Sequence, residues 1–141
     1  MKRNELRAML LEQPYDALVL TSEISRRYAT GFHSTAGAVY LSAKQAVFFT
    51  DFRYVEAAGQ SYSALINELL DEDGAKKVAL EDKTLTYAEF MSWGTALHAT
   101  AVRLEDGVEQ LRMCKEEDEV EKIVAAQRIA EQALEEVLND I

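Results

Sequence analysis

Cysteine and long apolar runs are scarce in this chain of 141 residues, and each scarcity excludes a class of protein. The single cysteine, Cys114, rules out an internal disulfide framework and is typical of a reducing compartment, which predicts a cytoplasmic protein. No apolar run approaches the roughly 20 residues of a membrane span, so the sequence predicts no membrane partner. The N-terminal residues have a helical pattern rather than that of a signal peptide, which favours the same location.

Basic residues are also few, and the charged residues are unevenly distributed along the chain. The chain has 15 basic and 25 acidic residues, for a net charge of −10. Twelve of the acidic residues but only four of the basic ones lie from Glu105 onward, so the body is nearly neutral and the tail is acidic. Neither part has the basic stripe of a nucleic-acid-binding protein, and the sequence predicts no nucleic-acid partner.

Apolar periodicity and turn-forming residues predict the order α-β-β-β-β-α-α-β-α-β-α. The expected helices cover residues 3–13, 51–59, 62–70, a stretch that begins at Thr86, and 116–141. The expected strands cover residues 16–21, 24–31, 76–81 and 99–104, with a hairpin over 38–50 whose turn is at 42–45. Helices mixed with a hairpin and single strands predict an α/β fold, a mixed β-sheet flanked by helices.

The helix that begins at Thr86 has the clearest start signal. Thr86 and Glu89 have the spacing of a capping box, and Leu85 and Phe90 stand at the positions of a hydrophobic staple. The apolar face expected for this helix consists of Tyr87, Phe90, Met91, Trp93 and Leu97.

The segment 116–141 predicts a long amphipathic helix of roughly 39 Å. Acidic residues crowd its first turn, where they complement the helix dipole. Its apolar stripe includes Val120, Ile123, Leu134 and Leu138. We expect this helix to pair with a second copy, to lie on its own sheet, or to begin a further domain, because the stripe would otherwise form an exposed patch.

The loop "TGFHSTAG" carries the best candidates for a functional contact, His33 and Ser34. The structural alternative is a loop whose glycines permit unusual backbone angles while Phe32 fills the core. Neither Ser34 nor Ser22 has the G-x-S-x-G surroundings of a nucleophile, so a contact with a partner or substrate is favoured over catalysis.

The remaining reactive residues favour structural roles. The two histidines and the cysteine lack the spacing of a zinc site. His98 is expected near a helix end, where a protonated imidazole complements the dipole, and Cys114 is expected to be a buried, inert thiol. Asp51 is expected to cap a helix, with Arg53 in its first turn or offered to a carboxylate.

Three stretches of this chain carry a recognisable pattern: "YATGFHSTAGAVYLSAKQAVFFTDFRYVEAA", "VALEDKTLTYAEF" and "VEQLRMCKEEDEVEKIVAAQRIAEQAL". Together they resemble the creatinase/prolidase N-terminal domain, which precedes the pita-bread catalytic domain of Xaa-Pro peptidases. The resemblance covers nearly the whole chain. It implies a domain over residues 1–110, with the layers of a ribonuclease H-like fold, and a linker over 111–141 that runs into the first helix of a catalytic domain beyond this chain.

The resemblance also implies that the catalytic residues belong to a different domain. Two divalent metal ions (Mn, Co or Zn) are expected in the catalytic domain, and no cofactor or catalytic residue is expected here. The expected partners are that catalytic domain, a second subunit in a homodimer, and proline-containing peptides. His33, Ser34 and Arg53 are the residues expected at the rim of the substrate site. Two alternatives stay open: a protein-binding module from a relative without metal ligands, and a creatinase-type amidinohydrolase.

Overall fold

The computed structural model describes residues 2–50 and 62–141, and the chain divides into two compact units, residues 1–109 and 110–141. The described helices are α1 (Lys2–Glu12), α2 (Glu23–Thr30), α4 (Tyr62–Asp73), α5 (Tyr87–Ala96), α6 (Gly107–Met113) and α7 (Glu117–Asn139). The strands are β1 (Ala17–Leu20), β2 (Ala38–Ser42), β3 (Ala46–Phe49), β4 (Lys77–Leu80) and β5 (Thr100–Arg103). These elements confirm every predicted strand except 24–31.

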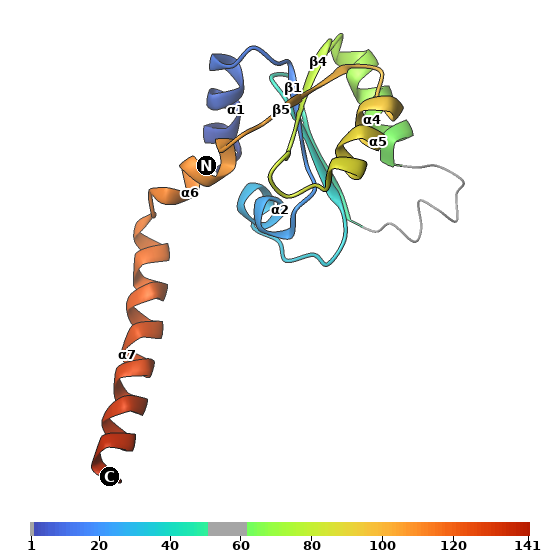
Figure 1. Ribbon diagram of the computed structural model, residues 1–141. Helices are drawn as coiled ribbons and strands as arrows, with labels where there is room; N and C mark the ends of the chain where they lie inside the picture. The colour runs from blue at the N-terminus through green and yellow to red at the C-terminus, as the bar shows by residue number, and fades with distance from the viewer. Residues whose placement is uncertain (1, 51–61) are drawn as a thin grey trace. The chain divides into compact units, whose positions relative to one another are not determined.

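The strands form one mixed sheet in the order β3-β2-β1-β4-β5 (Figure 1). β1 pairs antiparallel with β2 and parallel with β4, which in turn pairs parallel with β5. All four residues of β1 are fully buried, because this central strand is covered on both faces. That burial explains why its sequence, ALVL, is a continuous apolar run without alternation.

Helices cover both faces of the sheet, which confirms the predicted architecture (Figure 1). On one face, buried side chains of the sheet pack against Ile66 and Leu70 of α4 and against Leu97, the residue after α5. On the other face, α1 and α2 contact each other and β2. Leu6 and Leu10 of α1 are buried there.

Residues 24–31 lie in a helix, so the prediction of a strand there is wrong. Ser22 caps α2, because its hydroxyl accepts a hydrogen bond from the Ser25 backbone N–H at 3.2 Å. Gly31 ends the helix in the left-handed conformation, with a φ of 78°, which glycine adopts without steric cost. The buried face of α2 carries serine, arginine and alanine in place of large apolar residues, so hydrophobic periodicity does not reveal the helix.

The capping box of α5 is confirmed, but its predicted apolar face is only partly right. Thr86 Oγ1 accepts from the Glu89 backbone N–H at 3.2 Å, and Glu89 Oε2 accepts from the Thr86 backbone N–H at 2.7 Å. Tyr87 and Met91 are 81 % and 49 % exposed, because they lie on the side of α5 that faces away from the sheet. The predicted residues that do pack against the core are Phe90, Trp93 and Leu97.

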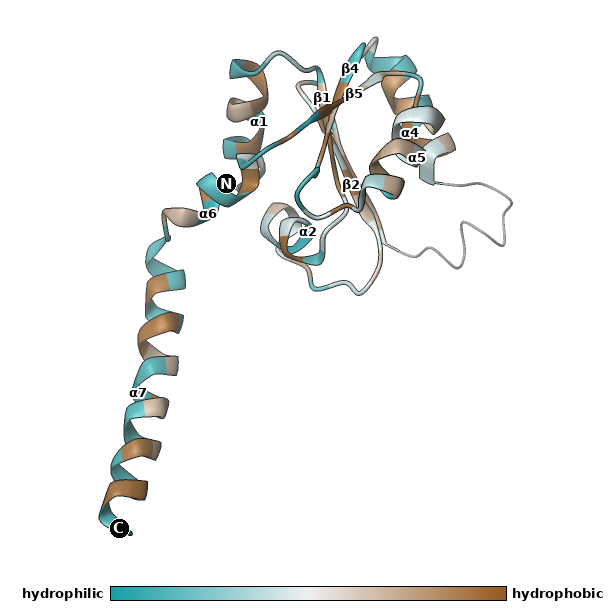
Figure 2. Cartoon of the chain, in the orientation of Figure 1, coloured by the Kyte–Doolittle hydropathy of each residue, from teal (hydrophilic) through white to brown (hydrophobic). Residues whose placement is uncertain are grey.

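In the second unit, α7 confirms the long helix predicted over 116–141. Apolar residues recur along it (Figure 2), and its large ones are between 43 % and 71 % exposed. These are Val120, Ile123, Val124, Ile129, Leu134, Val137 and Leu138. Among the described residues, no helix combines the length and the apolar character that crossing a membrane requires.

Candidate functional site

The loop of residues 31–37 joins α2 to β2 at the carboxyl end of β1. Val39, near the start of β2, lies opposite Leu20, the last residue of β1. Because β4 runs parallel to β1, Glu81 after β4 lies at the same end of the sheet. The chain leaves β1 toward one edge of the sheet and leaves β4 toward the other, which is the arrangement that opens a ligand crevice in many α/β proteins.

The Glu81 carboxylate lies at this end of the sheet, beside the residues that follow β1. Its Oε2 accepts hydrogen bonds from the backbone N–H groups of Thr21, at 2.6 Å, and Ser22, at 2.8 Å. Its Oε1 accepts from the Ser22 hydroxyl at 2.9 Å. Glu81 is 4 % exposed and lies at the beginning of α2, where the helix dipole favours an anion. An internal carboxylate thus occupies the place where a helix N-terminus binds an anionic ligand.

Arg26 fixes the path of the loop from the buried face of α2. The residue is 4 % exposed, and its guanidinium donates to the backbone carbonyls of Thr21, of Ser34 at 2.7 Å and of Gly37 at 3.2 Å. Its Nε also donates to the Ser34 hydroxyl at 3.3 Å. The five donors of a guanidinium lie in a rigid plane, so one side chain holds both halves of the loop against the start of α2.

Gly37 brings the end of the loop against β3. Its φ is 142°, a conformation that residues with side chains rarely adopt. A Cβ at this position would lie 2.3 Å from the Phe49 carbonyl oxygen, well inside van der Waals contact. Any other residue here therefore requires the backbone of the loop or of β3 to move.

The loop displays Phe32 and His33 to solvent. Phe32 is 68 % exposed, so the alternative in which it fills the core is wrong. His33 Nε2 lies 2.8 Å from Glu23 Oε1 in the first turn of α2, and both side chains are more than half exposed. An exposed pair of this kind contributes less than about 1 kcal/mol, so it does little to hold the imidazole away from a second partner.

The structure describes two of the three residues predicted at the rim. His33 faces solvent, whereas Ser34 is half-buried and accepts hydrogen bonds from Arg26 through both its hydroxyl and its carbonyl. Arg53 lies outside the described residues, as do Asp51 and the helix predicted over 51–59.

Sequence reasoning missed Arg26 and Glu81, the two buried charges that build this end of the sheet. The available signal is position: Thr21, Ser22 and Glu81 are polar residues that directly follow two buried apolar strands. Polar residues that follow neighbouring parallel strands meet at one end of the sheet.

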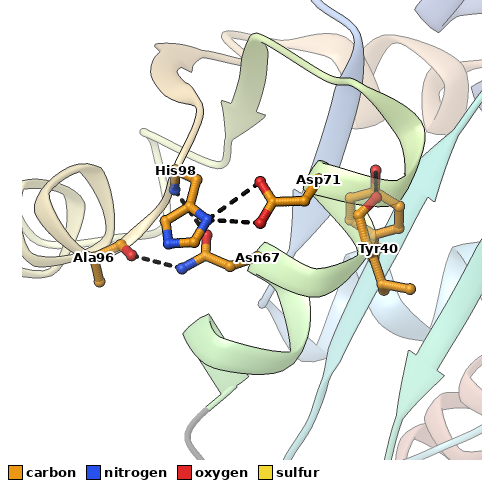
Figure 3. Close-up of polar contacts among 6 residues, drawn as sticks. Tyr40, Asn67, Asp71, Ala96 and His98 are labelled. Carbon is orange, nitrogen blue, oxygen red and sulfur yellow. Dashed lines mark hydrogen bonds and ion pairs between the residues drawn. The ribbon is translucent and has the colours of Figure 1, made fainter.

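His98 belongs to a polar cluster that joins α4 to the turn after α5 (Figure 3). Asn67 donates through Nδ2 to the Ala96 carbonyl at 2.9 Å and accepts through Oδ1 from the His98 backbone N–H at 2.7 Å. The His98 Nδ1 lies 3.0 Å from Asp71 Oδ2, and both side chains are exposed. Asn67 satisfies backbone groups at the end of α5, and the His98 imidazole pairs with Asp71 of α4.

No group of three or more His, Cys, Asp or Glu side chains within residues 2–50 and 62–141 is arranged to hold a metal ion. Cys114 is exposed, so the expectation of a buried thiol is wrong. It follows the last residue of α6, Met113, which is itself 76 % exposed. The groups that the loop of residues 31–37 exposes for contact are the Phe32 ring and the His33 imidazole.

Known proteins similar to this chain are peptidases. A family model described as the creatinase/prolidase N-terminal domain matches residues 2–114. The "uncharacterized peptidase YqhT" of Bacillus subtilis is 30 % identical over 151 aligned residues, which cover 98 % of this chain and 43 % of that protein.

Two solved structures extend the comparison. A Xaa-Pro dipeptidase from Bacillus anthracis matches at 35 % identity with a TM-score of 0.86, over 99 % of this chain and 43 % of that one. An X-Pro aminopeptidase from Thermotoga maritima matches at 25 % identity with a TM-score of 0.79, again over 99 % and 43 % of the two chains. This chain thus spans less than half the length of these relatives.

Proposed function

This chain belongs to the creatinase/prolidase N-terminal domain family, and we propose that it is the non-catalytic N-terminal domain of a metal-dependent Xaa-Pro peptidase. The observation that carries the proposal is the match of 99 % of the chain, at 35 % identity, to 43 % of a Xaa-Pro dipeptidase. The catalytic remainder would hold two divalent metal ions (Mn, Co or Zn) that activate a water molecule for hydrolysis of the Xaa-Pro bond.

Within that peptidase, the loop of residues 31–37 limits which peptides reach the catalytic site. Arg26 fixes the backbone of the loop, while Phe32 and His33 remain exposed. A loop with a fixed backbone and exposed side chains suits contact with a peptide, because little conformational entropy is lost on binding.

Dimerisation is the second role in this proposal. The apolar stripe of α7, with Leu134 and Leu138 both 59 % exposed, is a surface that the catalytic remainder or a second subunit covers. Sedimentation of the longer protein is expected to give a dimer. A monomer at all accessible concentrations would contradict this role.

Peptidase assays of the whole reading frame test the proposed function. We expect Mn²⁺-dependent release of the first residue from Ala-Pro and from longer Ala-Pro peptides, abolished by a chelator. Phe32→Ala and His33→Ala are expected to change the ratio of kcat/KM between longer peptides and Ala-Pro severalfold, since one peptide is long enough to meet the loop and the other is not. Tyr87→Ala, an exposed aromatic residue on α5, is the matched control and leaves that ratio unchanged.

Three results would overturn the proposal. Hydrolysis of an Xaa-Pro peptide by residues 1–141 alone would show that this domain is catalytic. Hydrolysis of creatine in place of peptides would indicate an amidinohydrolase. A reading frame that shows no hydrolysis with any divalent metal, yet binds another protein, would indicate a binding module.

A further inference from the structure

Glu81 and Arg26 are two buried charges that meet at a single peptide group. The peptide between Thr21 and Ser22 donates its N–H to Glu81 Oε2 at 2.8 Å, and its carbonyl accepts from the Arg26 guanidinium. The carboxylate and the guanidinium therefore bind opposite ends of one peptide dipole, so each hydrogen bond strengthens the other. Within residues 2–50 and 62–141, neither charge has an oppositely charged partner in direct contact.

Burying these two charges is costly, which indicates that they do more than stabilise the fold. Moving a carboxylate and a guanidinium out of water costs free energy that apolar side chains of similar size would not cost. What the charges provide is a fixed arrangement, because their hydrogen bonds join the start of α2 to the residue after β4 and to the loop of residues 31–37. A buried polar network whose members are satisfied specifies one conformation.

The loop is fixed on both sides of its exposed side chains. Before them, the Phe32 backbone N–H donates to the Thr30 hydroxyl at 3.0 Å, and that hydroxyl donates to the Arg26 carbonyl at 2.8 Å. After them, the Ser34 carbonyl accepts from the Arg26 guanidinium at 2.7 Å. Both points depend on Arg26, so the placement of Phe32 and His33 follows the placement of this one residue.

We propose that Glu81 is a positioning residue for peptide selection by the loop of residues 31–37, and that it acts through Arg26. The inference rests on the function proposed above, in which this loop limits which peptides reach the catalytic site. The role needs no contact between Glu81 and the peptide, since Glu81 is buried. Its carboxylate holds the start of α2, where the Ser22 carbonyl accepts from the Arg26 backbone N–H at 2.9 Å, and the Arg26 side chain holds the loop.

Amide spectra of the 141-residue chain test whether Glu81 positions the loop, and they require no peptidase activity. Glu81→Gln keeps the size of the side chain and one acceptor but removes the charge. We expect the backbone amides of residues 31–37 to shift, although no hydrogen bond joins them to Glu81. Ser22→Ala removes one of the three hydrogen bonds to the carboxylate and is expected to cause smaller shifts of the same amides. The spectra also report that each variant is folded.

Peptidase assays of the whole reading frame test whether that placement selects peptides. Glu81→Gln is expected to change KM for longer Ala-Pro peptides about fivefold while kcat stays within about twofold of wild type, because the loop affects binding of the peptide and not the chemical step. Arg26→Met is expected to change KM by at least as much. The double variant is expected to match Arg26→Met alone, since the carboxylate acts through the guanidinium. A residue that only stabilises the fold would not change KM alone.

Asp82→Asn is the matched control, because Asp82 directly follows Glu81 in the chain. Its carboxylate accepts from Arg103 and from the Glu105 backbone N–H instead of from the start of α2, so this variant is expected to leave the loop amides and KM unchanged. The proposal is overturned by loop amides that stay in place in Glu81→Gln, or by an unchanged KM in that variant while Phe32→Ala alters it. If neither Phe32→Ala nor Glu81→Gln alters KM, the loop takes no part in selection, and the role proposed for it above fails together with this inference.

Discussion

The two units of the chain differ in the burial of their leucine side chains. In the first unit, Leu18, Leu20 and Leu80 have no exposed surface, because the sheet is covered by helices on both faces. In the second, Leu134 and Leu138 are both 59 % exposed. Since burial of apolar area is the main source of folding free energy, the first unit has a core of its own, whereas no residue of α7 is buried. Most of the stability of a helix in a protein comes from packing of its apolar face, and the apolar residues of α7 are exposed.

A matched pair of leucine truncations gives the largest expected difference between the units. Leu80→Ala removes a fully buried side chain from β4 and is expected to lower the free energy of unfolding by about 2–5 kcal/mol. Leu134→Ala in α7 is expected to change it by less than about 0.5 kcal/mol. Urea unfolding followed by circular dichroism measures both. A similar loss in the two variants would mean that a second copy already covers α7 in solution.

A pair of arginine substitutions in α2 tests the framework of the loop. Arg26→Met keeps the length of the side chain but removes the buried donors to Thr21, Ser34 and Gly37. We expect the free energy of unfolding to fall by about 2–3 kcal/mol, because three partly buried carbonyls lose a charged donor. Arg27→Met, at the exposed neighbouring position, is expected to cost less than about 0.5 kcal/mol.

Amide spectra give a second measure of the same pair. Arg26→Met is expected to shift the backbone amides of residues 31–37, while Arg27→Met leaves them in place. An unchanged loop in Arg26→Met would mean that the glycines alone determine its path.

The degree of apolar burial also explains which elements of the fold the sequence predicts. β1 and β2 can be predicted because strands buried on both faces need continuous runs of apolar residues, and α5 can be predicted because its capping box is a local signal. Apolar periodicity does not predict α2, because its buried face is held by hydrogen bonds of Arg26 rather than by apolar contacts. The signals that do mark it are the cap Ser22 and the terminal glycine, Gly31.

The candidate site is harder to predict than the fold, because its contacts join residues far apart in the chain. Glu81 meets Ser22 across 59 positions, and no local pattern relates the two. The loop itself was recognisable from its glycines and histidine. The direction of each side chain was not, since Phe32 is exposed and the hydroxyl of Ser34 is turned to Arg26.

Substitution of a helix cap is expected to have a smaller effect on the free energy of unfolding, and the effect is expected to differ between the two units. Thr86→Ala removes the hydroxyl that accepts from the Glu89 backbone N–H, and it is expected to cost about 1 kcal/mol. Ser92→Ala, in the same helix, is the control for the loss of a hydroxyl at an exposed position. Glu116→Ala, at the start of α7, is expected to leave global unfolding unchanged because α7 contributes little to it. Thermal unfolding of the three variants measures this difference.

The smallest expected effect is a pH dependence at Asp82, which holds the end of β5. Burial alone would raise the pKa of this carboxyl, but hydrogen bonds from the Arg103 side chain and the Glu105 backbone N–H, both at 2.8 Å, outweigh it and lower the pKa below 3.8. A group whose pKa is lowered by folding stabilises the folded state above its ordinary pKa. That contribution is lost as the pH falls through the lowered value.

Comparing wild type with Asp82→Asn isolates this contribution from that of the other carboxylates. The difference in unfolding free energy is expected to be constant from about pH 7 to about pH 5 and to narrow toward about pH 2, as the wild-type carboxylate becomes protonated. Asp118→Asn in α7 breaks an exposed pair with Lys122, and its difference from wild type is expected to stay within about 0.5 kcal/mol at every pH. Because Asp118 is 59 % exposed and Asp82 is 13 % exposed, equal pH profiles for the two variants would mean that burial does not determine how strongly these carboxylates stabilise the folded chain.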